Sequence, residues 1–122
     1  MVRERALKVA LVVVGLLFLA TVYPLLQMHL EETLQMMLSI YVTLGVFLLL
    51  ASRNPSANRS LIAFAAWSSF AHGAVMAVLA IHIASERVSL LTAVAVLVII
   101  GVVLIALALA EQSGERASAA GA

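Results

Sequence analysis

The sequence of 122 residues contains no cysteine, and charged residues make up only 11% of it. The lack of cysteine excludes disulfides, thiolate metal sites, iron–sulfur clusters and a thiol nucleophile. The seven basic residues are scattered beside apolar segments, and the net charge is only +1. Because no basic run could follow a phosphate backbone, we do not expect nucleic acid as a partner.

Acidic residues are absent from four long apolar segments, which dominate a chain that is 65% hydrophobic with a mean hydropathy of +1.18. A helix of about 20 residues rises 1.5 Å per residue and matches a hydrocarbon core of about 30 Å. The sequence therefore predicts an all-α fold: a four-helix transmembrane bundle, up-down-up-down, forming one domain over residues 1–110. The expected helices are residues 6–26, 33–51, 60–84 and 89–110, and the small polar tail, residues 111–122, is expected to be disordered.

Prolines are few, and both fall at predicted helix ends. Pro24 should kink or end the first helix, and Asn54-Pro55 disfavours continued helix after the second. The third link is only about four residues long, from Ser85 to Val88. The third and fourth helices should therefore form a tight antiparallel hairpin.

The basic residues are distributed unevenly between the two sets of helix ends. The amino terminus, the second link and the tail hold six of them, whereas the first and third links hold only Arg87. By the positive-inside rule, both termini should be cytoplasmic. Arg53 and Arg59 in the second link are also candidate contacts for anionic lipid head groups.

A histidine near the middle of the third segment makes that helix the candidate for a functional site. His72 is accompanied by Ser68, Ser69 and Met76, and Thr43 of the second helix is a candidate fifth member of this midplane polar site. In one interpretation His72 is a packing residue that bonds to a hydroxyl across the bundle. In the other it accepts protons or gates a pathway, as polar groups at that depth often do.

Cofactor and metal chemistry are not expected. His72 with Met76 or Met36 offers haem ligand types, but no second histidine lies at matching depth. His82 and Glu86 have the i, i+4 spacing of metal ligands on one helical face, although ordinary interfacial polarity explains them as well. The other polar residues expected on that surface are His29, Glu31 and Glu32. With no carboxylate in the spans, proton-coupled export of the kind used by small multidrug exporters lacks its key residue, and we expect no catalytic residues.

Small residues recur every four positions along the third segment, at Ala65, Ser69, Gly73 and Ala77. Such a pattern lets another helix approach closely in a membrane. Besides the lipid bilayer, a homo-oligomer or a larger membrane complex is therefore an expected partner.

Several short runs resemble a family of small bacterial membrane proteins that is known only as a domain of unknown function. The similarity extends from Arg3 to about Leu109 and is most specific between Asn54 and Met76. The runs that carry it are Arg5-Ala6-Leu7-Lys8, Tyr23-Pro24, Ser39 to Gly45, Asn54-Pro55, Asn58 to Ile62, and Trp67 to His72 followed by Met76. The resemblance implies a multi-pass protein of the bacterial inner membrane and supplies no catalytic residues. We expect a non-enzymatic structural or accessory protein, with a small carrier or channel using His72 as the alternative.

Overall fold

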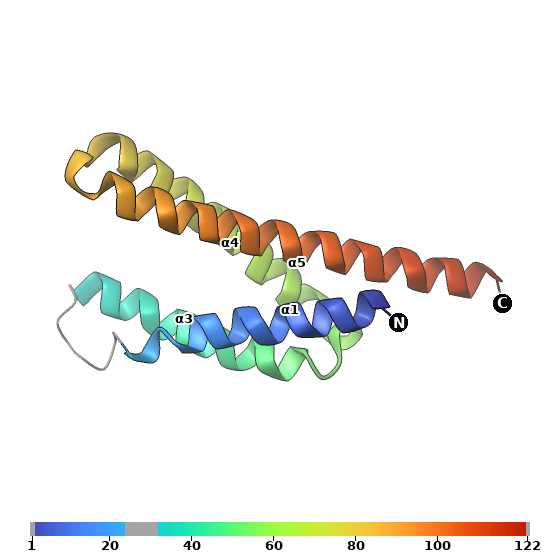
Figure 1. Ribbon diagram of the computed structural model, residues 1–122. Coiled ribbons are helices and arrows are strands. Elements are labelled where there is room, and N and C mark those ends of the chain that lie inside the picture. Colours follow the sequence, from blue (N-terminus) through green and yellow to red (C-terminus); the bar gives the residue numbers. More distant parts are fainter. Residues whose placement is uncertain (1, 24–31, 122) are drawn as a thin grey trace. The chain divides into compact units, whose positions relative to one another are not determined.

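The computed structural model describes residues 2–23 and 32–121 (Figure 1). These residues divide into two compact units, Met1–Arg59 and Ser60–Ala122, and each unit is described by itself. The helices are α1 (Val2–Leu19), α3 (Glu32–Ala51), η1 (Pro55–Asn58), α4 (Arg59–His82), η2 (Ala84–Glu86) and α5 (Arg87–Gly121), where η marks a short 3₁₀ helix. The all-helical class is confirmed over the described residues, whereas the up-down topology across a membrane stays a prediction.

Among the described residues, three helical stretches are long and apolar enough to cross a membrane: Glu32–Ala51, Pro55–His82 and Ala84–Gly121. The helix α1 has a shorter apolar part, because four of its first seven residues are charged. It also ends at Leu19, before the predicted end at residue 26. The backbone tightens there, with the Thr21 amide and hydroxyl both donating to the Phe18 carbonyl, at 3.1 and 2.6 Å. Pro24, the expected stop, lies outside the described residues.

In the first unit, α1 and α3 pack side by side and antiparallel (Figure 1). Their backbones cross at two glycines: a Cβ added to Gly45 would lie 2.7 Å from the Gly15 carbonyl oxygen. One turn further along α1, the Phe18 ring meets Tyr41 edge to face, with centroids 5.0 Å apart. Buried apolar side chains at helical spacing complete this core, namely Leu7, Leu11, Val14, Leu44, Leu48 and Ala51.

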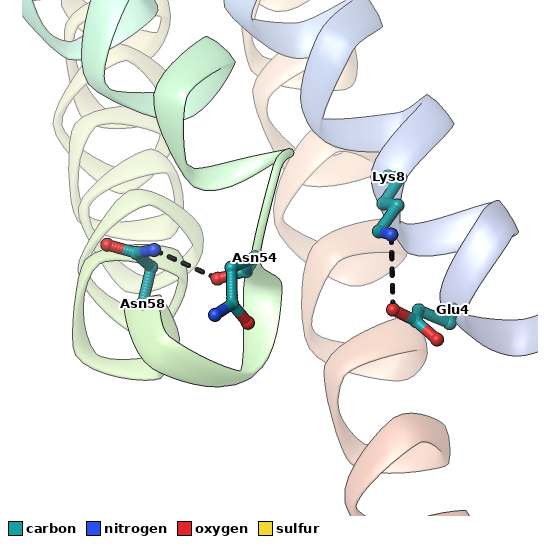
Figure 2. A network of polar contacts seen from close by, with 4 residues as sticks. All are labelled: Glu4, Lys8, Asn54 and Asn58. Atoms are coloured by element: carbon teal, nitrogen blue, oxygen red, sulfur yellow. Dashed lines mark hydrogen bonds and ion pairs between the residues drawn. The ribbon is translucent and has the colours of Figure 1, made fainter.

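The link between α3 and η1 breaks the helix where Asn54-Pro55 predicts a break. Asn54 is extended, with φ −146° and ψ 82°, as the residue before a proline should be. Its carbonyl accepts from the Ala57 amide at 3.2 Å and from the Asn58 side-chain amide at 2.9 Å, a contact drawn in Figure 2. Buried Pro55 then opens η1, at a position where a missing N–H costs nothing.

In the second unit, α4 and α5 form the tight antiparallel hairpin that the short third link predicts (Figure 1). A Cβ added to Gly73 would meet Leu97 Cβ at an ordinary 3.8 Å, and one added to Gly101 would lie 2.6 Å from the Phe70 ring. The Phe70 ring also contacts Trp67 edge to face at 5.4 Å. Gly73 of the small-residue pattern thus packs on α5 within this chain.

The end of α5 differs from the sequence-based expectation. Residues 111–122 were predicted to be disordered, but α5 continues as helix to Gly121. The tail holds good helix formers, including four alanines, two glutamates and an arginine, and it extends an existing helix, so it avoids the cost of nucleation. At 1.5 Å per residue, the 35 residues of α5 span about 52 Å, well beyond a hydrocarbon core of about 30 Å.

Candidate functional site

Four of the five residues predicted to form the midplane polar site lie on α4. Ser69 is 1% exposed, while Ser68, His72 and Met76 are half-buried. Thr43 lies on α3 in the first unit, where its side chain is exposed. The structure therefore brings together Ser68, Ser69, His72 and Met76 on one helix, and it describes Thr43 as part of a different unit.

The hydroxyl groups of this site are bonded to the backbone of their own helices. The Ser69 hydroxyl donates to the Ala65 carbonyl at 2.7 Å, and the Ser68 hydroxyl donates to the same oxygen at 3.2 Å. On α3, the Thr43 hydroxyl donates to the Ser39 carbonyl at 3.0 Å. Bonds of this kind satisfy a hydroxyl without any partner helix. None of the three protons is directed at a general base, so these groups lack the activation that a nucleophile needs.

His72 occupies the middle of α4. It follows the first residue of the helix by thirteen positions, about 20 Å, and precedes the last by ten, about 15 Å. Ser68 and Met76 stand one turn to either side of it, on the same helical face. Its neighbour Gly73 is buried against Leu97 and Val98 of α5. The polar face of α4 thus lies next to the face that packs on α5.

A second candidate region, the basic end, lies where α1 begins and α3 ends. Gly15 of α1 faces Gly45 of α3, and the two helices are antiparallel. Lys8, seven residues before Gly15, therefore lies level with Ser52, seven residues after Gly45. Contacts of η1 with both helices hold the link at this end. The basic end contains Arg3, Arg5, Lys8, Arg53 and Arg59.

One acidic residue, Glu4, is also part of the basic end. It pairs with Lys8 at 3.1 Å, one helical turn apart, as Figure 2 shows. This exposed pair stabilises the helix little. Five basic residues against one acidic residue leave a local net charge of +4, with the predicted lipid contacts Arg53 and Arg59 both exposed to the surroundings.

The i, i+4 spacing of His82 and Glu86 does not place the two residues on one helical face. The helix α4 ends at His82, and Glu86 belongs to η2, so the two side chains do not share a helical face. Over residues 2–23 and 32–121, no group of three or more His, Cys, Asp or Glu side chains could hold a metal ion. His29 and Glu31 lie outside the described residues.

Sequence reasoning missed the role of Arg87. Its Nε donates to the Ala80 carbonyl at 2.8 Å, and its Nη2 donates to the Ile81 carbonyl at 3.3 Å. These carbonyls lie in the last turn of α4, where no amide of the helix can reach them. The available signal was the one arginine of the predicted third link, Ser85 to Val88, which lies shortly after the end of the preceding helix.

Over the described residues, the fold and these contacts define a class: a helical protein with three stretches that can cross a membrane and with hydroxyl groups in those stretches bonded within their own helices. The chain belongs to DUF6632, a family of unknown function whose model matches residues 3–120. The comparison with curated proteins and the comparison with solved structures gave no match. The predicted membership of a family of unknown function is thereby confirmed.

Proposed function

We propose that this chain is a non-enzymatic, multi-pass protein of the bacterial inner membrane with a structural or accessory role. The observation that carries the proposal is the bonding of the hydroxyl groups in the spans. Each of five donates to a carbonyl three or four residues earlier in its own helix: Ser39, Thr43, Ser68, Ser69 and Thr92. Hydroxyl groups bonded in this way are satisfied in lipid without a partner outside the helix, and they are not activated for chemistry.

The outer surfaces of the helices support a membrane location. Large apolar side chains are exposed along α4 and α5, among them Phe64 at 59%, Val75 at 60% and Ile99 at 62%. In water such a surface would be an aggregation hazard, whereas in a bilayer it faces acyl chains of matching polarity. The basic end supports the orientation, because arginines near a span favour the cytoplasmic, anionic leaflet. In this proposal Arg53 and Arg59 contact anionic lipid head groups.

A small carrier or channel is the second candidate, and one observation favours it. His72, Ser68 and Met76 form a half-buried row at the middle of α4, where an imidazole could exchange protons with water in a pathway. Its chemistry would be proton coupling or gating, with Ser69 of the same helix as a further polar group.

Flux measurements separate the two functions. The full chain is reconstituted into liposomes that enclose a pH-sensitive dye, and proton flux is compared with that of empty liposomes over pH 5 to 8. The structural role predicts no difference between the wild type, His72→Gln and empty liposomes. Flux that is present in the wild type, lost in His72→Gln and kept in Phe64→Leu, a change at an exposed residue of α4 outside this row, would instead establish the carrier or channel.

Stability measurements give the complementary result. If His72 only packs, His72→Leu should lower the free energy of unfolding in detergent by about 1 kcal/mol, the usual size of a polar contact between membrane helices. A smaller loss of stability in His72→Gln than in His72→Leu would show that the imidazole contributes a hydrogen bond, because glutamine can still form one. Crosslinking in native membranes then tests the accessory role, which predicts defined adducts of constant stoichiometry.

A further inference from the structure

The helices α4 and α5 form a groove next to the arginine that caps α4. The groove has a volume of about 260 Å³, is not enclosed, and is lined by Ala77, Ala80, Ile81, Arg87 and Leu91. Its walls are almost entirely apolar, since Arg87 is the polar residue among the five. Sites that hold whole small molecules are usually about 300–1,000 Å³, so this groove suits one part of a larger, flexible ligand.

The arginine in this groove has donors to spare. A guanidinium carries five N–H groups, and two of those of Arg87 donate to the Ala80 and Ile81 carbonyls. Three donors therefore remain. Among the described residues, no carboxylate lies within ion-pair distance of Arg87. The two backbone contacts also fix the plane of the guanidinium, so less conformational entropy is lost when it binds a ligand.

The position of Arg87 selects the ligand. It is the first residue of α5, and its side chain carries a full positive charge to the carbonyl end of α4. It also stands at the end of the apolar spans, where arginines reach the level of lipid head groups. A guanidinium binds phosphate in two-point contacts. Ile81 and Leu91, 71% and 47% exposed, flank it with apolar surface.

We propose that this groove binds one phospholipid, whose phosphate accepts hydrogen bonds from the remaining donors of Arg87 and whose acyl chain starts between Ile81 and Leu91. The lipid would complete the cap of α4 and hold the α4–α5 link at the membrane surface. The site differs from the basic end in the first unit. It depends on the membrane location and not on whether His72 has a function.

Native mass spectrometry of the full chain in detergent tests the proposal. After delipidation, the protein is titrated with dioleoyl-phosphatidylglycerol and, separately, with dioleoylglycerol, which has the same chains and no phosphate. We expect a saturable phospholipid at this groove, distinct from lipid held at the basic end, and about tenfold weaker binding of dioleoylglycerol, because charge-assisted hydrogen bonds are lost. Equal binding of the two lipids would overturn the phosphate contact. Displacement of the phospholipid by millimolar inorganic phosphate would show a free-phosphate site and overturn the proposal.

Two variants and one control locate the site. Arg87→Gln removes the donors, and Ala77→Leu fills the groove while keeping the arginine; each should weaken phosphatidylglycerol binding about tenfold. Arg116→Gln makes the same change of charge in the last turns of α5, away from the groove, and should bind as the wild type does. Wild-type affinity in Ala77→Leu, with an unchanged circular dichroism spectrum, would overturn the proposal even if Arg87→Gln fails to fold.

Discussion

The two units both place a glycine where helices meet, but the atoms that face each glycine differ. In the first unit, Gly45 lies against backbone, with Gly15 O and Leu19 N both 2.7 Å from the position of an added Cβ. In the second, Gly101 lies against the ring of Phe70, whose nearest atom is 2.6 Å away. Backbone in a helix cannot move aside without separating the helices, whereas a ring can rotate. The α1–α3 contact should therefore be the less tolerant of the two.

The largest effect is expected for Gly45→Ala. The new methyl group forces α1 away from α3 and disturbs the Phe18–Tyr41 ring contact, so we expect a loss of about 2–3 kcal/mol, the upper part of the range for overpacking. Unfolding of the purified chain by increasing mole fractions of sodium dodecyl sulfate, followed by circular dichroism, measures it. Gly121→Ala, with nothing within 4 Å of the added Cβ, is the control and should be neutral.

A smaller effect is expected for Gly101→Ala, about 1–2 kcal/mol, because Phe70 can turn away at the cost of its contact with Trp67. The double variant with Phe70→Leu sharpens the comparison. If the new methyl group clashes with the Phe70 ring, the double variant should lose less stability than the sum of the losses measured for Gly101→Ala and Phe70→Leu alone. Strict additivity would show that the clash lies elsewhere.

The smallest effect, and one of opposite sign, is expected for Gly73→Ala. Its added Cβ would lie 3.8 Å from Leu97 Cβ, an ordinary contact, and alanine is the better helix former by about 0.8–1 kcal/mol in water. We expect the same denaturant titration to give a change between zero and a gain of that size. A loss above about 1 kcal/mol would mean that α4 and α5 lie closer together than the structure has them.

The sequence alone predicts the helices and their breaks well, for clear physical reasons. Long apolar runs without charge can hardly be anything other than membrane-length helices, and Asn54-Pro55 interrupts one of them through sterics. Helix ends are harder to predict. Leu19 ends α1 inside an apolar run, and the tail of α5 stays helical because an existing helix propagates into it.

The contacts of the candidate site could be predicted only in part. The residue types near His72 mark it as polar, but the bonding of Ser68 and Ser69 to one carbonyl depends on side-chain rotamers, which composition does not specify. The small-residue stripe indicates close approach at Gly73, yet the tightest approaches are at Gly45 and Gly101. Which residue each glycine contacts depends on how one helix is aligned along its neighbour. The residue pattern of a single helix does not specify that alignment.

The central claim is that α3, α4 and α5 cross a membrane, with the α3–α4 link and the tail on one side and the α4–α5 link on the other. The chain has no cysteine, so single substitutions report position without background. Ser56→Cys, Ser118→Cys and Ser85→Cys are each exposed to a membrane-impermeant maleimide in right-side-out and in inverted vesicles. The account predicts labelling of the first two only in inverted vesicles and of Ser85→Cys only in right-side-out vesicles. Labelling of all three from the same side would contradict it.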